Sequence, residues 1–270
     1  MTSDSLKIKP EKMDFRAYSI SWNLTKRCNL NCDHCYLDAD FRGGFRNDEL
    51  DTEQCKRVVD QIAEVNPNAF LILTGGEPLL RPDIYELIRY AADKKFMVVL
   101  GTNGTLINKV NAKKIKDAGA HGVGISIDSM DAVKHNKFRG VSGAWEHSME
   151  AFKILNEVGV DFLIQMSVSN MNYKEIPDVV AFTEKIGAIA FNLYFLVCTG
   201  RGQGNTDISN EAYEEALKML YEEQMKYKGR LMINSKCAPQ YKRVVYENDP
   251  DSVYTRTYSG GCPAGTHYSR

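Results

Sequence analysis

The sequence predicts an α/β fold: a partial (β/α)6 barrel of the TIM type, followed by a short irregular C-terminal extension. A strand-like run followed by a helix-like run occurs six times in succession, and each pair takes about 30 residues. The pattern never reverses, which favours a barrel over the remaining alternative, a flat doubly wound sheet. Unusual polar motifs also stand where strand-like runs end, as active-site residues do in such barrels.

Each of the six units has its own sequence support. The strand-like runs cover residues 18–25, 69–74, 96–102, 121–128, 160–169 and 188–197. The helix-like runs, with apolar residues at helical spacing, cover residues 52–65, 81–93, 108–119, 143–159, 174–187 and 210–227. Several helices are expected to end at a glycine in the C′ position, namely at Gly119, Gly159 and Gly187.

The unit pattern divides the chain into three parts. Residues 1–17 form a polar leader, residues 18–228 the barrel, and residues 229–270 the extension. Residues 230–235 are strand-like, and the chain from Cys237 onward is expected to be irregular because it contains Cys, Pro and Gly. The extension is too short for a core of its own.

Composition restricts the class of protein. Hydrophobic residues make up 43% and charged residues 26%, which is typical of a globular protein with a packed core. A net charge of -1 argues against a nucleic-acid surface, and no apolar run is long enough to cross a membrane. We expect a cytoplasmic protein, in which the seven cysteines are ligands, catalytic groups or buried small side chains rather than disulfides.

Polar motifs stand at or just after the end of all six strand-like runs. In chain order they are CNLNCDHC (28–35), GGEP (75–78), TNG (102–104), Ser126 with Asp128, Gln165 with Ser167, and TGRG (199–202). The carboxyl ends of parallel strands meet at one rim, so these motifs are expected to lie together. This rim is the expected active site.

The first motif holds three thiols, at Cys28, Cys32 and Cys35. Structural zinc sites usually have four ligands, and neither a second CxxC pair nor a zinc-type pair of histidines follows. An iron-sulfur cluster held by three cysteines has one iron without a protein ligand, where another molecule can bind. Zinc and metal-free redox thiols remain alternatives, and His34 is expected to pack against the cluster without ligating it.

The CxxxCxxC spacing of these cysteines resembles the signature of the radical S-adenosylmethionine (SAM) superfamily, and GGEP, TNG and SxD follow in that family's order. The resemblance covers about residues 18–197. It implies a [4Fe-4S] cluster whose open iron is chelated by the amino and carboxylate groups of SAM. It also implies an enzyme in which one electron, from a donor such as flavodoxin or ferredoxin, cleaves SAM to a 5′-deoxyadenosyl radical that abstracts hydrogen. The cofactor then carries the chemistry, and no side chain is assigned as catalytic.

The resemblance assigns SAM contacts to the second and third motifs. Gly75 and Gly76 allow close approach of the backbone, and Glu77 offers a carboxylate or backbone partner for the SAM ammonium. A tight turn before a proline-initiated helix is the alternative for this motif. Asn103 is expected to contact SAM or substrate through its amide, although Asn-Gly is also an ordinary turn.

Further contacts are implied after the fourth strand. Ser126 and Asp128 match residues that hold the ribose hydroxyls of SAM, and Arg139 matches an arginine that meets its carboxylate. A solvated surface charge is the alternative for Arg139. Gln165 and Ser167 share a strand face and either point into the barrel or form a polar pair in the core.

The C-terminal extension resembles the start of a SPASM or twitch region, because GCPAG around Cys262 matches the opening of that pattern. The resemblance implies an auxiliary iron-sulfur cluster, with Cys237, Cys262 and Cys198 as candidate ligands. A full set has seven cysteines, which these do not complete before Arg270, so a truncated chain, a degenerate tail and a partial site all stay open. Cys55 is instead expected to be a core residue.

The segments TGRG, WNLTKRCNL and CAPQYKR are similar to radical SAM enzymes of tetrapyrrole maturation. The similarity implies oxidative decarboxylation or removal of haem-precursor side chains. Arg139, Arg201, Lys242 and Arg243 are candidate partners for the carboxylates of such a substrate.

Two other functions remain as hypotheses. The first is a peptide-modifying maturase of the sulfatase or quinone-cofactor type, although residues 1–17 are too few for a leader-recognition domain. The second is a non-catalytic iron-sulfur electron carrier, which needs the cluster but neither GGEP nor SxD.

Overall fold

In the computed structural model, one curved and wholly parallel sheet forms the centre of the protein, and residues 19–44, 48–196, 199–202, 208–252, 255 and 268–269 are described. The strand order is β10-β1-β4-β5-β6-β7-β8-β9. The strands are β1 (Ser19–Asn23), β4 (Phe70–Thr74), β5 (Met97–Thr102), β6 (Gly122–Ser126), β7 (Phe162–Val168), β8 (Ala190–Phe195), β9 (Met232–Lys236) and β10 (Tyr268–Ser269). A second, small sheet pairs β2 (Arg27–Cys28) with β3 (Asp40–Phe41).

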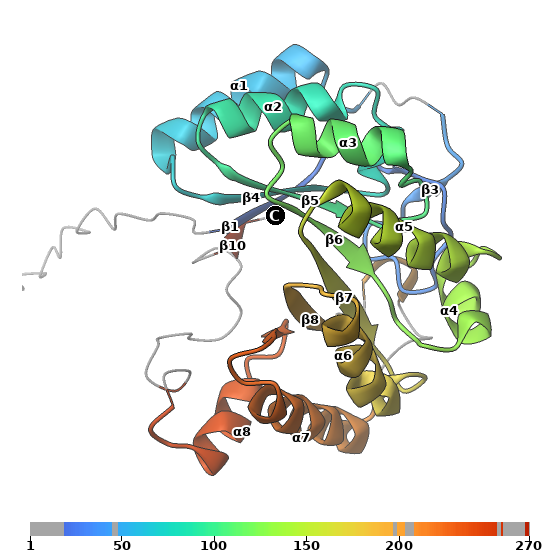
Figure 1. Cartoon of the computed structure of the whole chain (residues 1–270), viewed down its shortest axis with the longest axis vertical. Coiled ribbons are helices and arrows are strands. Elements are labelled where there is room, and N and C mark those ends of the chain that lie inside the picture. Colours follow the sequence, from blue (N-terminus) through green and yellow to red (C-terminus); the bar gives the residue numbers. More distant parts are fainter. Residues whose placement is uncertain are drawn as a thin grey trace, which may run out of the picture.

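Helices cover the outer, convex side of this sheet (Figure 1). They are α1 (Thr52–Val65), α2 (Ile84–Asp93), α3 (Lys109–Asp117), α4 (Ala132–Arg139), α5 (Ala144–Val158), α6 (Ile176–Lys185), α7 (Asn210–Lys226) and α8 (Tyr241–Asn248). Short 3-10 turns stand at η1 (Pro78–Leu80), η2 (Tyr173–Glu175) and η3 (Gly200–Gly202). A curved sheet with helices on one side is a partial barrel, so the flat doubly wound alternative, which has helices on both faces, is excluded.

The two faces of the sheet differ in polarity. Alternate residues of the strands, such as Leu71, Leu100 and Ile164, are fully buried and pack into the main core with the helices. The residues between them point to the inside of the barrel, where Ser21 of β1 and Ser126 of β6 line a cavity. The interior is therefore polar near the carboxyl ends of the strands.

Local sequence signals fix several helix ends. Asp51 and Gln54 form a capping box at the start of α1, in which each side chain accepts a hydrogen bond from the backbone N–H of the other. Gly119, Gly159 and Gly187 follow α3, α5 and α6 with φ values of 89°, 72° and 78°. Gly119 and Gly187 thus occupy the predicted C′ positions, whereas Gly159 is the C-cap residue of α5, one position earlier than predicted. In the described part of the chain, no helix has the length and apolar character needed to cross a bilayer.

The six predicted strands and their helices are confirmed, and the strand-like run at 230–235 forms most of β9, beside β8. The chain beyond Cys237 is not irregular throughout, because α8 packs against α7 and buries Tyr241, Val244 and Val245 in the main core. This helix is short, which weakens its helical pattern in the sequence. The domain boundary near residue 229 stays a prediction.

Helix α4 has no counterpart among the predicted elements. Its buried residues include His135 and Arg139, which are polar, so an apolar stripe does not reveal it. Gly140 ends it in the left-handed conformation, and the side chain of Asp131 caps its start.

Leu71 tests the core on the helix-facing side of β4. Its side chain is fully buried, so Leu71→Ala is expected to lower the free energy of unfolding by roughly 2–5 kcal/mol. Val133→Ala is the control because Val133 is 77% exposed, and its effect should stay within about 0.5 kcal/mol. Urea unfolding followed by circular dichroism measures both variants, and equal effects would contradict the placement of Leu71.

Candidate active site

Motifs from all six strand ends surround one cavity of about 220 Å³ inside the barrel. Its lining includes Cys28, Cys32, His34, Cys35, Gly75, Gly76, Asn103, Ser126, Arg139, Gln165, Ser167, Arg201 and Cys237. The prediction that the motifs lie together at one rim is therefore confirmed, and Gln165 and Ser167 face the inside of the barrel. Glu77 and Asp128 are buried outside this lining, with 0% and 1% of their surface exposed.

Residues 24–36, here called the cysteine loop, are held by three other strand-end segments. Backbone hydrogen bonds join the loop to the segments after β4, at the end of α4 and after β8. They run from Gly76 N–H to the Thr25 carbonyl (2.7 Å), from Asn31 N–H to the Arg139 carbonyl (3.1 Å), and from Arg201 N–H to the Cys35 carbonyl (3.0 Å). The shape of the loop thus depends on segments that are distant in the sequence.

Glycines allow these segments to approach the cysteine loop closely. A Cβ atom at Gly75 would lie 2.5 Å from the Thr25 carbonyl oxygen, and one at Gly76 would lie 2.3 Å from that of Arg27. Gly75 also has a φ of 141°, which side chains rarely adopt. The glycines of GGEP therefore serve the packing of the loop as well as the cavity.

Gly140 and Gly200 make equivalent contacts from the other two segments. A Cβ atom would lie 2.1 Å from the Asn31 carbonyl oxygen at Gly140, and 2.4 Å from that of Cys35 at Gly200. Neither glycine was predicted from the sequence to have a function. The sequence feature that could have indicated them is a glycine next to an arginine, in KFRG for Gly140 and in TGRG for Gly200.

Each of the three thiols accepts an N–H hydrogen bond at its sulfur. The donors are Leu30 N to Cys28 Sγ (3.4 Å), Arg139 Nη1 to Cys32 Sγ (3.9 Å) and Ala39 N to Cys35 Sγ (3.3 Å). Such donors stabilise metal-bound thiolates, so the donor set fits an iron-sulfur cluster. Burial raises the pKa of Cys28 to about 12 and raises that of Cys32, so loading of metal must release protons.

A single metal ion is a poorer match for this loop. Within the described ranges, no three His, Cys, Asp or Glu side chains are arranged to hold one ion. A cluster of several irons offers each thiolate its own iron, so its three ligands need not meet at one ion. The geometry therefore favours the cluster over the zinc alternative.

Glu77 connects the second and third motifs. Its carboxylate accepts hydrogen bonds from Thr102 Oγ1 (2.7 Å), Asn103 N (2.9 Å) and Leu79 N (3.0 Å). Burial raises its pKa to about 7, although these donors act in the opposite direction. The carboxylate is thus occupied inside the protein, and only the backbone around it remains near the cavity.

Asn103 also has internal partners. Its Nδ2 donates to Asn29 Oδ1 in the cysteine loop (2.8 Å), and its Oδ1 accepts from the backbone and side chain of Thr105 (2.9 and 2.7 Å). The TNG motif therefore supports the cysteine loop from the side of β5, while Asn103 still lines the cavity.

A buried ion pair joins Asp128 to Arg139, with 2.6 Å between Oδ2 and Nε. The other carboxylate oxygen of Asp128 accepts from Ser167 N (2.9 Å). Burial acts to raise the pKa of Asp128, but Arg139 together with the neighbouring His34 and His135 holds the pKa below its usual value. Arg139 is 7% exposed, so the alternative of a solvated surface charge is wrong.

The imidazole of His34 stacks on Phe138, with 4.1 Å between ring centroids and 9° between ring planes. Burial lowers the pKa of His34 to about 3, with a further contribution from Arg139, so the ring is neutral. Its Nδ1 is buried and has no hydrogen-bond partner in the described structure.

The cysteines proposed as auxiliary-cluster ligands and the C-terminal cations proposed as substrate partners differ in their surroundings. Cys237 lines the cavity and has a φ of 58°, a strained conformation for a residue with a side chain. Cys198 and Cys262 lie outside the described residues. Arg243 is outside the described cavity lining and pairs with Glu214 and Glu247. Lys242 is likewise outside that lining.

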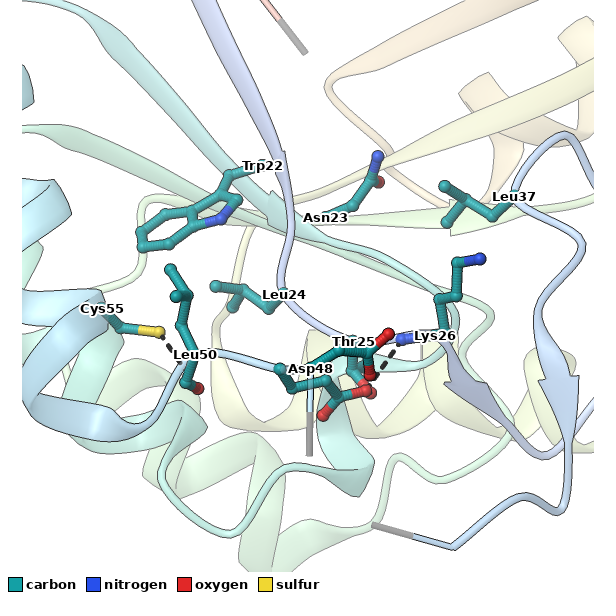
Figure 2. Close-up of a pocket in the computed structure, with 10 residues that line it drawn as sticks. Trp22, Asn23, Leu24, Thr25, Lys26, Leu37, Asp48, Leu50 and Cys55 are labelled. Atoms are coloured by element: carbon teal, nitrogen blue, oxygen red, sulfur yellow. Dashed lines mark hydrogen bonds between the residues drawn. The ribbon is translucent and has the colours of Figure 1, made fainter. Parts of the chain in front are cut away.

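A second cavity of about 230 Å³ is lined by residues 22–26, by Leu37, by residues 48–50 and by Cys55 of α1 (Figure 2). Trp22, Leu24 and Leu50 form its apolar wall, and Lys26 is among its polar residues. Cys55 Sγ also lines it, donates to the Leu50 carbonyl (3.8 Å) and is 1% exposed, which confirms a core position for this cysteine. The rim motifs do not contribute to this cavity.

Comparisons with known proteins agree with this geometry. Residues 22–183 match the model of the Radical SAM superfamily. The AdoMet-dependent heme synthase of Methanosarcina barkeri is 36% identical over 261 residues, which cover 92% of this chain and 72% of that protein. The pre-heme d1 synthase of Dinoroseobacter shibae is 32% identical over 87% of this chain and 56% of that protein. The structure of Streptococcus suis SuiB bound to precursor peptide SuiA has the same fold, with a TM-score of 0.75 and 17% identity over 93% of this chain and 56% of that one.

Gly76 tests the close packing of the cysteine loop. Gly76→Ala places a methyl group against the Arg27 carbonyl, so the loop must shift and the protein is expected to retain less than about a third of its iron and sulfide after reconstitution. Gly44→Ala is the control, because its added Cβ has no non-neighbouring atom of the described residues within 4 Å. Equal iron contents in both variants would show that the contact does not matter.

The raised pKa of the buried Glu77 carboxyl can be tested through the pH dependence of stability. Its folded pKa of about 7 exceeds the ordinary value of 4.5, so its contribution to stability is complete below about pH 4.5 and is lost as the pH rises through 7. Between pH 5.5 and 8.5 the metal-free protein is expected to lose roughly 2 kcal/mol more unfolding free energy than Glu77→Gln. Urea unfolding at both pH values measures the difference. Parallel losses in the two proteins would contradict the raised pKa.

Proposed function

The chain belongs to the radical SAM superfamily, and from this premise we propose that it is an enzyme that modifies the side chains of a carboxylate-bearing tetrapyrrole. Cys28, Cys32 and Cys35 would hold the [4Fe-4S] cluster that members of this family bind together with SAM. When bound, the cluster and SAM supply one-electron cleavage of the sulfonium, which leads to hydrogen abstraction from the substrate. The residues of the chain bind, orient and shield these groups.

The positive charge of the cavity is the main structural support for a carboxylate-bearing substrate. Arg139 and Arg201 both line the cavity, whereas none of the described lining residues is Asp or Glu. The positive charge of these guanidinium groups attracts carboxylates, and a tetrapyrrole with acidic side chains offers several carboxylates. Two of the similar proteins are a heme synthase and a pre-heme d1 synthase, which supports this substrate class.

The proposed SAM contacts use the groups that line the cavity and are not already hydrogen-bonded inside the protein. Ser126 lines the cavity and would meet the ribose, whereas both oxygens of the Asp128 carboxylate already accept hydrogen bonds. Asp128 would then act by orienting Arg139, whose guanidinium is the proposed partner of the SAM carboxylate. The backbone of Gly75 and Gly76, rather than the Glu77 carboxylate, would meet the SAM ammonium.

An auxiliary cluster remains a proposal that Cys237 supports. Its thiol lines the same cavity as the three cysteines of the loop, on the segment that follows β9. A ligand there would place a second iron-sulfur group, or the substrate itself, next to the first. Cys262 and Cys198 would be its partners.

The reductant and the compartment are also part of the proposal. An electron donor such as flavodoxin or ferredoxin would reduce the cluster. The proposed compartment is the cytoplasm, where thiols stay reduced and available as cluster ligands.

The second candidate function is a peptide maturase. The fold matches that of SuiB bound to a precursor peptide, and this likeness favours it as the alternative. The two candidates share the cluster and SAM, so only the substrate distinguishes them.

SAM cleavage tests the enzyme class. Protein reconstituted without air and reduced with dithionite is expected to convert SAM to 5′-deoxyadenosine, measured by liquid chromatography. Cys32→Ala is expected to lower this rate at least about 100-fold because one cluster ligand is lost, whereas Cys55→Ala, a change in the core, should leave it near that of the parent. A Cys32→Ala protein that still cleaves SAM at the parent rate would contradict the ligand assignment.

Mass spectrometry of the product then separates the two substrate classes. Incubation with iron-coproporphyrin or didecarboxysirohaem is expected to change the mass of one of them. Unchanged tetrapyrroles together with a modified precursor peptide would favour the maturase.

A further inference from the structure

The TGRG segment (199–202), which includes η3, packs directly against the cysteine loop. Arg201 reaches Cys32 although 169 positions separate them in the sequence. The contact with Gly200 leaves no room for a side chain between the two segments. β8 therefore delivers this arginine to the three cysteines.

Arg201 makes hydrogen bonds to three consecutive parts of the loop and of the turn that follows it. Its backbone N–H donates to the Cys35 carbonyl (3.0 Å), and its Nε donates to the Cys32 carbonyl (3.1 Å). Its Nη1 donates to the Ala39 carbonyl (2.8 Å) and to Asp38 Oδ1 (3.0 Å). Two of these carbonyls belong to cluster ligands, so the guanidinium fixes where Cys32 and Cys35 lie.

The remaining nitrogen of this guanidinium is unusual. Arg201 Nη2 is buried and has no hydrogen-bond partner in the described structure, while the residue lines the cavity with the three thiols. A buried N–H without an acceptor is costly, so the assembled site is expected to supply one. Asp38 does not neutralise this charge toward the cavity, because its side chain is 68% exposed and solvent screens the pair.

Cys32 lies between two guanidinium groups. Arg139 donates to its sulfur and Arg201 donates to its carbonyl oxygen. Asp128 balances the charge of Arg139 through a buried ion pair, whereas the exposed Asp38 is the only ionic partner of Arg201 among the described residues. Arg201 therefore contributes the less compensated positive charge beside this ligand.

We propose that Arg201 is a positioning residue that fixes the ligating shape of the cysteine loop and raises the reduction potential of the iron-sulfur cluster beside it. Reduction adds one negative charge to the cluster, and a nearby cation with an available N–H stabilises that charge. The proposal deepens the function proposed above, because it rests on the cluster at Cys28, Cys32 and Cys35 but not on the identity of the substrate.

The test compares Arg201→Gln, Arg201→Lys and a control in the full chain, reconstituted with iron and sulfide without air. Arg230→Gln is the control, because Arg230 is an exposed arginine outside the described cavity lining and pairs with Glu184. One measurement is the rate at which a chelator removes iron. The other is the reduction potential, from a redox titration followed by electron paramagnetic resonance, without SAM or substrate.

Arg201→Gln is expected to lose iron about tenfold faster than the parent. Its equilibrium constant for one-electron reduction is expected to fall about tenfold, which corresponds to a potential lower by about 59 mV. Arg201→Lys keeps the charge but cannot reach the same carbonyls, so it should lose iron quickly while its reduction constant stays within about threefold of the parent.

Three results would overturn the proposal. The first is an Arg201→Gln protein that equals Arg230→Gln in both measurements. The second is faster loss of iron without a change in potential, which would make Arg201 a plain structural brace. The third applies if Arg201→Gln holds no cluster, so that Arg201→Lys becomes the deciding variant. Loss of iron from Arg201→Lys at the parent rate would then overturn the proposal. A parent protein without a [4Fe-4S] signal would instead contradict the proposed function.

Discussion

Close packing of backbone against backbone around the cysteine loop is the constraint on which the rest of the site depends. Glycines at positions 75, 76, 140 and 200 meet carbonyl groups of the loop at distances that exclude a Cβ atom. These glycines belong to three different βα units, so the loop takes its shape only when the curved sheet has brought the units together. Fold stability and the geometry of the three thiols are therefore coupled.

The charges of the site follow the same arrangement. The described lining of the cavity carries two guanidinium groups and no carboxylate, while the carboxylates of Glu77 and Asp128 are buried outside that lining and already accept hydrogen bonds. Glu77 thus holds neighbouring backbone and hydroxyl groups, while Asp128 orients Arg139, which lines the cavity. This arrangement suits anionic ligands and the added charge of a reduced cluster.

Local patterns in the sequence were sufficient for the strands, most helices and the three-cysteine motif, because alternation, helical spacing and thiol spacing are local properties. The direction of Glu77 was not predictable in this way, since its partner Thr102 belongs to another strand end. The hydrogen bonds from Arg201 to the cysteine loop were not predictable either, because Arg201 and Cys32 are 169 positions apart in the sequence. Helix α8 was not predicted because a short helix has too few turns to reveal the helical spacing of its apolar residues.

Electron paramagnetic resonance of the reduced, reconstituted protein with and without SAM tests the central claim most directly, namely that Cys28, Cys32 and Cys35 hold a cluster with one iron open to SAM. We expect the signal of a singly reduced [4Fe-4S] cluster, with g values that shift when SAM is added. Either the absence of such a signal or a signal that SAM leaves unchanged would contradict the claim.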